Sequence, residues 1–503
     1  MLAKILSGAI LGVNGYKVDV EVDVSQGLPS FDIVGLPDSS IKESRERVRT
    51  AIKNSGFEFP IKRITVNLAP ADVRKEGPYF DLPIAVGLLN CINIIPSYLD
   101  TFFAGELSLD GHIKPINGIL PMVFDLSKRG IKNFVVPIDN LPEASLISNI
   151  NVYGISHLKE LKNLSTSFNP TNLQNMSYTN TDYELDFKDV KGQAVVKRAL
   201  LVAAAGAHNA LIIGPPGSGK TMMAKRMPSI LPNLTFEESV DTTKIYSVSG
   251  LIKDKNTLIT KRPFRAPHHT ISYAALVGGG KSIKPGEISL AHNGILFLDE
   301  LPEFNRNVLE VLRQPLEEKS INISRASANI TYPSNFMLIA SMNPCPCGNY
   351  SVGDKCTCSI NEVARYLAKI SGPLLDRIDI HIEAPKLNYS DLELQKQTQS
   401  SLEMKEMVLL ANKMQEKRYK TNTKFNSNIN SKEIEEYCVL SDTCKKLLET
   451  AFDTLGLSVR GYHKILKVAR TIADLDAKTD IELTHLTEAI NYRSLDRKFF
   501  SLS

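Results

Sequence analysis

The segment Gly214–Thr221, with the sequence GPPGSGKT, limits the possible folds of this chain more than any other feature. It follows an apolar stretch expected to be a strand, Ala210–Ile213, and it precedes MMAKRM, which can form a helix. A glycine-rich turn between a strand and a helix directs backbone N–H groups toward an anion. We therefore predict a phosphate-binding loop in an α/β domain. The residues expected to surround the phosphates are Gly214, Pro215, Pro216, Gly217, Ser218 and Gly219.

The two residues that close this segment carry its chemistry. Lys220 would place a positive charge beside the phosphates, and Thr221 would offer a hydroxyl to Mg²⁺. The alternative is a glycine-rich turn that binds no ligand. Because strand, loop and helix signals occur in the required order, we favour a nucleotide with Mg²⁺.

Two further apolar strands end in polar residues. Ile295–Leu298 is followed by Asp299 and Glu300, and Phe336–Ala340 leads to Asn343. Parallel strands deliver such residues to one sheet edge, where ligands bind in this class of fold. Asp299 suits Mg²⁺, Glu300 suits activation of a water, and Asn343 could orient that water. The alternative for the carboxylates is a structural cap.

Two arginines lie further along the chain. Arg377, in SGPLLDRIDI, could reach the γ-phosphate held by a neighbouring subunit, or it could form an ordinary ion pair with Asp376 or Asp379. In GLSVRGYHK, Ser458 is a candidate helix N-cap that places Arg460 in the first helical turn. An anion is favourable at that position, and a surface arginine is the competing interpretation.

Composition is that of an ordinary globular protein. The 503 residues suffice for about three domains, and 43% hydrophobic with 23% charged residues excludes a wholly disordered or membrane-embedded chain. The formal net charge of +4 gives no argument for nucleic acid by itself. The most apolar stretch, Leu82–Ile95, is too short to span a bilayer. We expect a cytoplasmic protein without a membrane partner.

Periodicity divides the chain into a multidomain α/β protein. Alternating residues at Tyr16–Val24 predict a strand, and Ile41–Ile52 predicts an amphipathic helix. A polar segment rich in Asn, Ser and Thr then predicts a linker. Strands alternate with helices after it, and only helical periodicity remains near the C-terminus. The predicted units are an α+β domain at 1–162, a linker at 163–185, an α/β domain at 186–388 and a helical domain at 389–503.

Four of the seven cysteines crowd into one short stretch, as Cys345, Cys347, Cys356 and Cys358. This clustering suggests a reducing compartment and four thiolates round one Zn²⁺. Each pair is separated by one residue, which is tighter than the spacing usual in zinc knuckles. Redox-active thiols and unliganded cysteines remain alternatives.

The ordered segments GPPGSGKT, RPFRAPHHTIS, GEISLAHNGILFLDE, MNPCPCG and SGPLLDRIDI resemble those of the magnesium-chelatase-like AAA+ ATPases. The N-terminal part resembles that of the YifB/ComM branch, which carries a Lon-protease-like domain before the motor. The resemblance implies a hexameric, ATP-driven DNA helicase that promotes branch migration when competent bacteria integrate incoming DNA. Single-stranded and branched DNA are the implied partners.

The resemblance also assigns roles by position. It makes Asn343 the first sensor, Arg377 the arginine finger and Arg460 the second sensor. Residues Asp189–Gln193 resemble the segment that lies beside the adenine in this family. The resemblance implies that Val190 and Gln193 contact the nucleotide.

Residues 273–287 and the hairpin at 321–333 resemble two insertions typical of this group. The resemblance implies that both face the pore of the ring. Mobile glycines and cations there would suit contacts with phosphates rather than bases. The cations are Lys281, Lys284 and Arg325. Solvated charges on ordinary turns are the alternative. The absence of Trp argues against a platform for stacked bases.

The Lon-like part lacks the residues of a peptidase. Tyr79 stands at the position of the catalytic serine and Met122 at that of the lysine, although the nearby Ser108 or Lys114 could change this alignment. Neither Tyr nor Met forms a serine–lysine dyad, so we expect no peptide hydrolysis. Two alternatives to a DNA motor are a magnesium-chelatase-type ATPase subunit and a nucleotide-dependent protein-remodelling scaffold.

Overall fold

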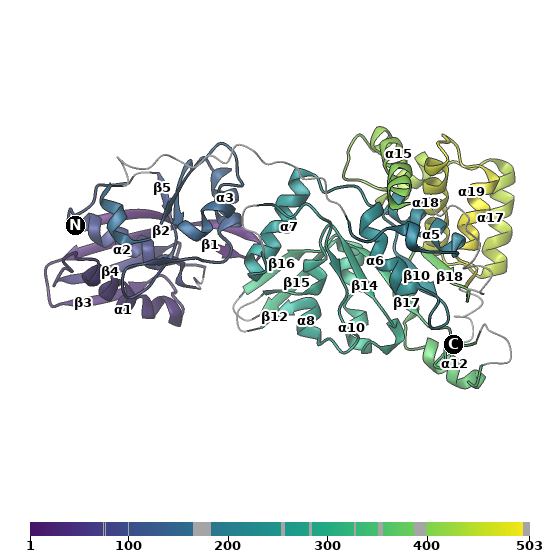
Figure 1. The fold of residues 1–503 in the computed structure, drawn as a ribbon, viewed down its shortest axis with the longest axis horizontal. Coiled ribbons are helices and arrows are strands. Elements are labelled where there is room, and N and C mark those ends of the chain that lie inside the picture. Colours follow the sequence, from purple (N-terminus) through teal and green to yellow (C-terminus); the bar gives the residue numbers. More distant parts are fainter. Residues whose placement is uncertain are drawn as a thin grey trace.

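A computed structural model describes residues 1–73, 75, 77–98, 100–163, 183–252, 257–280, 284–325, 328–350, 356–386 and 399–495. Its three parts follow one another along the longest axis of the molecule: an N-terminal domain, a central sheet domain and a helical C-terminal domain (Figure 1). The predicted multidomain α/β fold is confirmed. Most of the predicted linker, residues 164–182, lies outside the described residues.

The N-terminal domain is built on a seven-stranded mixed sheet with the order β3-β4-β2-β1-β5-β8-β9. Strands β1 and β2 form a long antiparallel hairpin, and alternate side chains of β2 are buried, as its sequence predicts. The strands are β1 (Leu2–Leu11), β2 (Asn14–Ser25), β3 (Ser30–Val34), β4 (Arg63–Ala69), β5 (Thr101–Phe103), β8 (Asn133–Pro137) and β9 (Asn151–Ile155).

The longer helices of this domain pack on the sheet. Helix α1 (Ser39–Asn54) begins at Asp38, whose carboxylate accepts a hydrogen bond of 2.9 Å from the backbone N–H of Ile41. This cap satisfies one of the unpaired amides of the first turn. Helix α2 (Asp81–Cys91) is apolar on nearly every side and is buried almost entirely. Helix α3 (Ile119–Ser127) packs on β2 and faces the central domain.

The central domain contains a parallel sheet with the order β11-β14-β17-β10-β18. Every residue of β10 is buried, and alternate residues belong to different apolar clusters: Ala210 and Ile212 pack on one face, Leu211 and Ile213 on the other. A parallel sheet covered on both faces therefore explains the continuous apolar strands. The strands are β11 (Phe264–Arg265), β14 (Ile295–Leu298), β17 (Met337–Met342), β10 (Ala210–Ile213) and β18 (Ile380–Glu383).

Helices and a short hairpin complete the central domain. The antiparallel pair β15 (Ser320–Arg325) and β16 (Ala328–Pro333) confirms the hairpin predicted there. The short pair β12 (Gly278–Gly279) and β13 (Lys284–Pro285) lies in the first insertion. The helices used below are α5 (Ala194–Gly206), α6 (Lys220–Ile230), α7 (Phe236–Ser249), α8 (Tyr273–Val277), α11 (Arg313–Glu318) and α13 (Gly372–Leu375).

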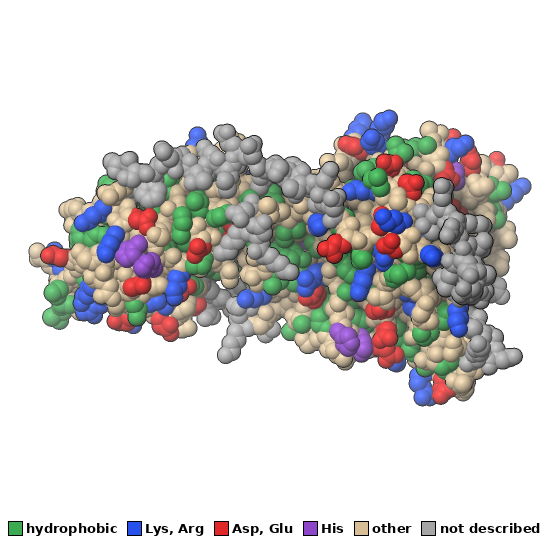
Figure 2. Space-filling view, viewed as in Figure 1, with side chains coloured by type: hydrophobic (Ala, Val, Ile, Leu, Met, Phe, Trp, Pro, Cys, Tyr) green, Lys and Arg blue, Asp and Glu red, His purple; other side chains and the backbone are tan. Residues whose placement is uncertain are grey.

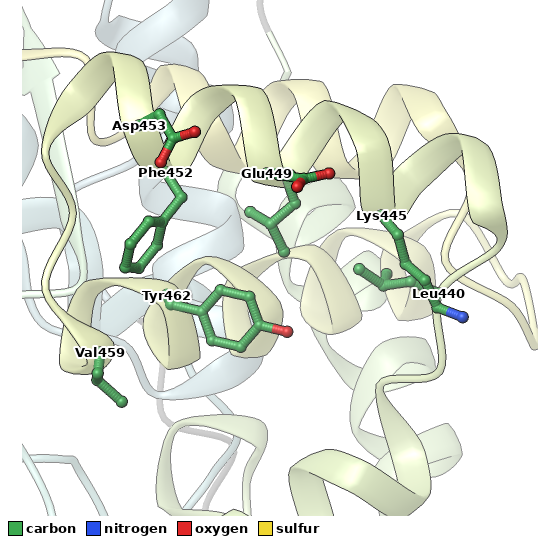
Figure 3. A pocket seen from close by; sticks show the side chains of 8 residues that line it. Leu440, Lys445, Glu449, Phe452, Asp453, Val459 and Tyr462 are labelled. Carbon is green, nitrogen blue, oxygen red and sulfur yellow. The ribbon is translucent and has the colours of Figure 1, made fainter.

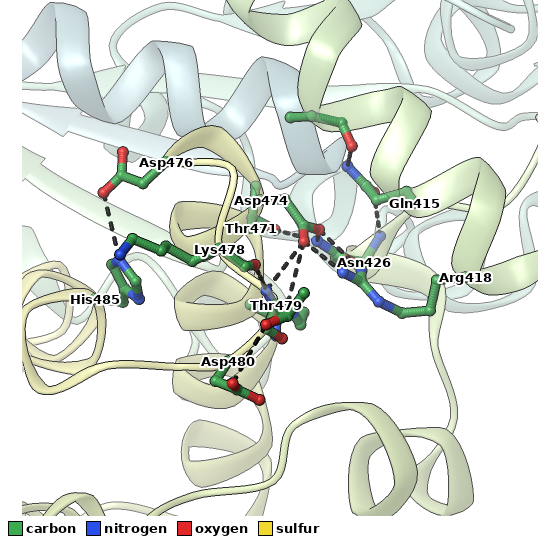
Figure 4. A network of polar contacts seen from close by, with 12 residues as sticks. Gln415, Arg418, Asn426, Thr471, Asp474, Asp476, Lys478, Thr479, Asp480 and His485 are labelled. Carbon is green, nitrogen blue, oxygen red and sulfur yellow. Dashed lines mark hydrogen bonds and ion pairs between the residues drawn. The ribbon is translucent and has the colours of Figure 1, made fainter.

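The C-terminal domain is helical, as its periodicity predicts. Its helices are α15 (Ser401–Tyr419), α16 (Ser431–Tyr437), α17 (Asp442–Leu455), α18 (Val459–Leu475) and α19 (Leu483–Asn491). The fully buried carboxylate of Asp474 binds three groups: Arg418 at 2.9 Å, Asn426 at 2.9 Å and Arg470 at 3.2 Å (Figure 4). Because the charge is shared with two guanidinium groups, its burial is tolerated. This network joins α15 to α18.

The N-terminal and central domains pack through α3 and α7. Lys244 forms an ion pair of 3.0 Å with Asp125, and the Ser247 hydroxyl donates a hydrogen bond of 2.5 Å to Glu143. An apolar cluster of Leu120, Leu146, Val240 and Leu258 contains residues of both domains. Both charges of the ion pair are largely buried, which fixes one domain against the other.

The turn between β1 and β2 also meets the central domain. Val13 belongs to the apolar cluster that contains Ile323 of β15. A Cβ atom on Gly12 would lie 2.8 Å from Cγ2 of Ile330 in β16. The N-terminal domain therefore touches the hairpin to which we assigned Arg325.

Among the described residues, no helix is both long and apolar enough to cross a bilayer.

Candidate functional site

The phosphate loop follows β10 and is shaped by its glycines. The Gly214 N–H donates to the Met342 carbonyl at 3.1 Å, which continues the β10–β17 ladder into the loop. A Cβ on Gly214 would lie 2.4 Å from the carbonyl oxygen of Ala384, so no larger residue fits there. Gly217 and Gly219 have positive φ values of 76° and 86°, which glycine adopts without strain.

Lys220 is the first residue of α6, and its amine lies at the centre of the loop. It donates hydrogen bonds to the carbonyls of Gly214 at 2.7 Å and Pro215 at 3.0 Å, and to the side-chain oxygen of Asn343 at 3.2 Å. Burial lowers the pKa of the Lys220 amine, and the nearby Asp299 carboxylate opposes that shift. The structure thus brings together the loop lysine and the asparagine predicted to be the first sensor.

Thr221 and Asp299 meet as a pair suited to Mg²⁺. The Thr221 hydroxyl donates to the Asp299 carboxylate at 2.7 Å, and the Ser341 hydroxyl donates to the other oxygen of that carboxylate. Hydroxyl and carboxylate oxygens are the ligands that Mg²⁺ prefers. Sequence reasoning missed Ser341, although its position near the end of β17 is a usable signal.

Glu300 follows Asp299 and has a left-handed backbone with φ of 54°, which turns its exposed side chain away from the strand. Nδ1 of His269 lies 3.6 Å from a carboxylate oxygen of Glu300. The rings of His268 and His269 are in contact, with centroids 4.1 Å apart. The contact with Glu300 therefore places His269 beside the proposed base.

The adenine-side residues lie beside the loop. The Gln193 side-chain amide donates to the carbonyls of Ser218 at 3.2 Å and Pro385 at 2.7 Å. Val190 is buried in the core, and its carbonyl accepts a hydrogen bond from the Lys197 amine. Gln193 therefore contacts the phosphate loop directly, whereas Val190 supports the segment that leads to it.

Arg377 lies at the opposite edge of the sheet from the phosphate loop. Its carbonyl accepts a hydrogen bond of 3.1 Å from the side chain of Asn209, the residue before β10, whereas the loop follows the other end of β10. Its guanidinium pairs with Glu317 at 2.6 Å rather than with either neighbouring aspartate. One of these, Asp379, is held instead by Lys464 at 2.8 Å.

Arg460 points toward the same carboxylate. Ser458 caps α18 by accepting a hydrogen bond of 3.1 Å from the Gly461 N–H, as predicted, and this places Arg460 in the first turn. A guanidinium nitrogen of Arg460 lies 3.8 Å from the Glu317 carboxylate. Both arginines assigned to phosphate chemistry therefore share one partner on the edge of the sheet away from their own loop.

An apolar groove of about 470 Å³ lies between α17 and α18 in the C-terminal domain (Figure 3). Phe452 and Tyr462 point into it, Val459 lies at its end, and Asp453 and Glu449 line the α17 side. Val459 is the residue before Arg460, so the groove opens next to that arginine. None of the residues predicted to bind nucleotide lines it.

The four cysteines predicted as a zinc site come together. Their sulfur atoms all lie within 4.8 Å of one another, with Sγ of Cys356 3.8 Å from that of Cys345 and 3.7 Å from that of Cys347. Tetrahedral Zn²⁺ with Zn–S bonds of about 2.3 Å requires sulfur separations of roughly 3.8 Å. Backbone N–H groups of Asn349 and Thr357 lower the pKa of the Cys347 thiol to about 5, and burial raises that of Cys345 to about 12. The two separations from Cys356 match this value, the one between Cys345 and Cys347 is shorter at 3.3 Å, and the set of four sulfur donors fits zinc.

The structure places one of the three cations predicted to contact DNA. Lys284 lies in β13 with an exposed side chain, Lys281 lies outside the described residues, and Arg325 ends β15 with its side chain outside them. A Cβ on Gly278 would lie 3.0 Å from the side chain of Ile323, so the two insertions lie side by side. On the face in Figure 2, Lys and Arg side chains are interspersed with Asp and Glu, so the described part of that face shows no broad basic field.

The positions of the Lon-type dyad hold no catalytic pair. Met122 is fully buried in α3, and Tyr79 packs against the same apolar cluster. Ser108 lies in the turn between β6 (Glu106–Leu107) and β7 (Ile113–Lys114), and its N–H donates to the His112 carbonyl. Lys114 is exposed on β7.

The phosphate loop follows β10, which lies between β17 and β18 in a parallel five-stranded sheet, and acidic and amide residues follow the other strands. This arrangement defines a P-loop ATPase of the AAA+ class. Family comparison supports this class. Magnesium chelatase, subunit ChlI, matches residues 186–392, its C-terminal part matches residues 398–493, and a third description, subunit ChlI of Mg-chelatase, matches residues 20–140.

The chain belongs to the ComM/YifB family of magnesium-chelatase-like proteins. It is 45% identical over 516 aligned residues to competence protein ComM of Haemophilus influenzae, with 100% of this chain and 99% of that protein covered. It is 43% identical over 508 residues to the protein YifB of Salmonella typhimurium, with 100% and 99% covered. A weaker similarity, 27% over 148 residues, relates 27% of the chain to 26% of Lon protease 2 of Bacillus subtilis.

Proposed function

We propose that this chain is a ring-forming ATPase whose hydrolysis step is completed between copies and drives movement along DNA. The position of Arg377 carries the proposal. The four residues of β10 span about 13 Å, and Arg377 and its own phosphate loop lie beyond opposite ends of that strand. A second copy is therefore needed to bring an arginine to the γ-phosphate. A closed ring satisfies this head-to-tail arrangement, and we propose six subunits.

The residues of the loop and its neighbouring strands would perform hydrolysis within one copy. Lys220 and the loop amides bind the β- and γ-phosphates, while Thr221 and Asp299 hold Mg²⁺, which offsets phosphate charge when bound. Glu300 accepts a proton from the attacking water, and Asn343, anchored by Lys220, orients that water. Arg377 and Arg460 of the next copy would stabilise the charge that develops on the phosphate, with an arginine finger worth about 10³ to 10⁵ in turnover.

DNA is the proposed track. The name of one relative, competence protein ComM, supports a role in competence, and we propose that this role is branch migration during integration of incoming DNA in the cytoplasm. The adjoining insertions, which contain Lys284 and the Arg325 hairpin, would bind phosphates without sequence preference. We retain the boundaries 1–162, 163–185, 186–388 and 389–503 for its units, and propose that the first organises the ring and cleaves no peptide.

A structural Zn²⁺ is part of the same proposal. Cys345, Cys347, Cys356 and Cys358 would supply four thiolates whose sulfur atoms lie within 4.8 Å of one another, so zinc would close the loop that begins two residues after Asn343. Such a metal would supply rigidity and no redox chemistry.

The matches to magnesium chelatase favour a second function, an ATPase subunit that drives metal insertion. The two functions differ in the ligand that raises ATP turnover. The test measures ATP hydrolysis of the full chain with three- and four-way DNA junctions, and then branch migration on those junctions. Stimulation and strand exchange support the motor. Turnover that no DNA changes contradicts it and favours metal insertion or a protein-remodelling scaffold.

Two variants separate hydrolysis from DNA binding. Glu300→Gln should retain ATP and DNA binding while turnover falls by about 10²-fold or more. Arg325→Ala should weaken binding to every DNA sequence and flatten its dependence on salt, because each lost phosphate contact lowers the slope of log affinity against log salt by about 0.9. Lys446→Ala, an exposed lysine on α17, is the matched control. Unchanged binding in Arg325→Ala would exclude the hairpin as a DNA contact.

A peptidase assay tests the N-terminal domain. The full chain should cleave no casein with or without ATP. ATP-dependent cleavage that disappears in Lys220→Ala would show that a different pair of residues replaces the lost dyad.

A further inference from the structure

Glu317 lies between the two arginines proposed to act on a neighbouring copy. Its carboxylate is 2.6 Å from Arg377 and 3.8 Å from Arg460, and the same oxygen, Oε1, receives both. The two arginines come from segments far apart in sequence, one in the loop before β18 and the other in α18. A single carboxylate therefore gathers cations from the central and C-terminal domains.

The contact with Glu317 occupies one of the two terminal nitrogens of the Arg377 guanidinium. One terminal nitrogen donates to the Pro373 carbonyl at 2.6 Å, and the other faces Glu317. The Nε atom of Arg377 is buried and has no hydrogen-bond partner among the described residues. Binding of a phosphate oxygen by the terminal nitrogens therefore competes with Glu317, since a guanidinium has a fixed set of donors.

The solvent exposure of the side chains indicates which member of the Arg377–Glu317 pair can move away from the other. The Arg377 side chain is only 13% exposed, whereas Glu317 is 50% and Arg460 is 62% exposed. Arg377 is fixed by its surroundings, and the carboxylate is the part of the contact open to solvent. An incoming phosphate with greater negative charge would displace Glu317 while the arginine stays in place.

Glu317 is also tied to the β15–β16 hairpin. Helix α11 ends one residue after it, Lys319 accepts the hydrogen bond from the Ser334 N–H at 2.8 Å, and β15 starts at Ser320. The Lys319 N–H in turn donates to Pro315 of α11 at 3.1 Å. Because α11 and both ends of the hairpin share this anchor, a displacement of the hairpin moves the backbone that carries Glu317.

We infer that Glu317 is a positioning residue that restrains Arg377 and Arg460 until the hairpin moves or the phosphate of a second copy displaces it. The inference rests on the proposed function for the identity of the phosphate and of the hairpin's ligand. In the absence of polynucleotide the Glu317 carboxylate slows ATP hydrolysis. Movement of the β15–β16 hairpin then changes the rate of ATP turnover.

The test compares ATP turnover of the full chain, at saturating ATP and fixed protein concentration, with and without a DNA junction. Glu317→Gln should raise the DNA-free kcat by roughly two- to fivefold, the range expected for loss of one partly exposed charge pair, and bring the ratio of stimulated to basal rate toward one. Glu317→Asp, which keeps the charge, should retain most of the wild-type ratio. Glu318→Gln, in the same helix and bound to Gln314, is the matched control and should behave as wild type.

A double variant assigns the effect to the arginine. In an Arg377→Ala background, Glu317→Gln should change the rate no further, because the group it restrains is absent. A DNA-free kcat that is unchanged or reduced in Glu317→Gln, or an equal increase in the Arg377→Ala background, overturns the inference. If DNA does not stimulate ATP turnover of the wild type, the proposal that the chain moves along DNA is contradicted. The comparison of wild type and Glu317→Gln without DNA still decides the role of Glu317.

Discussion

Gly348 packs directly against Pro216, so the cysteine loop touches the phosphate loop. A Cβ added to Gly348 would lie 2.5 Å from Cδ of Pro216. The Gly348 N–H donates to the Cys345 carbonyl at 3.0 Å, which closes the turn that carries the first two cysteines. The candidate metal site and the candidate nucleotide site are therefore neighbours, and we expect a distortion of one loop to alter the other.

Gly348→Ala is expected to weaken ATP binding. Gly348 has a φ of 80°, so alanine adds backbone strain as well as the clash with Pro216. Overpacking of this kind costs about 1–3 kcal/mol, which would raise the Kd for ATP by roughly tenfold if the phosphate loop yields. Gly56→Ala, at a φ of 78° with nothing within 4 Å of the added Cβ, isolates the backbone term and should leave the Kd unchanged. An unchanged Kd in Gly348→Ala would show that the two loops move independently.

Metal analysis tests the cysteine site. Protein purified without chelator should carry about one Zn²⁺ per chain, and its removal should lower the melting temperature, since a bound metal stabilises only the folded state. Cys347→Ser should lose the metal. Cys444→Ser, at a buried cysteine of α17 outside the cluster, should retain it. Protein free of zinc before any chelation would leave the four thiols without a structural metal.

Local patterns in the sequence explain which parts of the fold and the site could be predicted. The apolar strand before Gly214 and the strand that ends at Asp299 are each recognisable from a few consecutive residues. The parallel sheet then brings their ends together without further information. The strand before Asn343 was placed at Phe336–Ala340, and β17 extends to Met342 because its last residues complete the ladder with β10.

Contacts between distant segments could not be predicted in this way. Glu317 lies 60 residues before Arg377 and 143 before Arg460, and nothing in its own segment distinguishes it from an ordinary helix carboxylate. The packing of Gly348 on Pro216 likewise depends on how two loops meet. Such pairs arise from tertiary geometry, which periodicity does not encode.

The β1–β2 turn of the N-terminal domain is expected to support the β15–β16 hairpin. In Gly12→Ala the new methyl group would lie 2.8 Å from Cγ2 of Ile330, and the φ of 68° resists alanine. We expect faster amide hydrogen exchange in the hairpin and weaker DNA binding. Removal of the opposing methyl groups in Gly12→Ala/Ile330→Ala should recover part of the loss, whereas Gly130→Ala, with no atom within 4 Å of its Cβ, should have no effect on the hairpin. Normal exchange in Gly12→Ala would show that the turn does not bear on the hairpin.

Acid should destabilise the central domain through His292, three residues before β14. Burial lowers the pKa of His292 from 6.5 to about 4, and Nδ1 of its ring accepts a hydrogen bond of 3.0 Å from the Asn335 N–H, which requires the neutral form. Below pH 6.5 the unfolded chain binds a proton at this residue and the folded chain does not. The free energy of unfolding therefore falls as the pH drops from about 6.5 to 4, by about 3 kcal/mol over that window.

His292→Asn provides the measurement for this prediction. The asparagine oxygen can accept the same hydrogen bond and does not titrate, so protection of the β14 amides against hydrogen exchange should depend less on pH between 6.5 and 4 than in the wild type. His268→Asn, at an exposed histidine of the same domain, should keep the wild-type dependence. Equal pH dependence in the wild type and His292→Asn would mean that other groups account for the acid sensitivity. A reduced dependence in His292→Asn alone would assign that part of the sensitivity to the buried ring, because the two variants differ in which imidazole they remove.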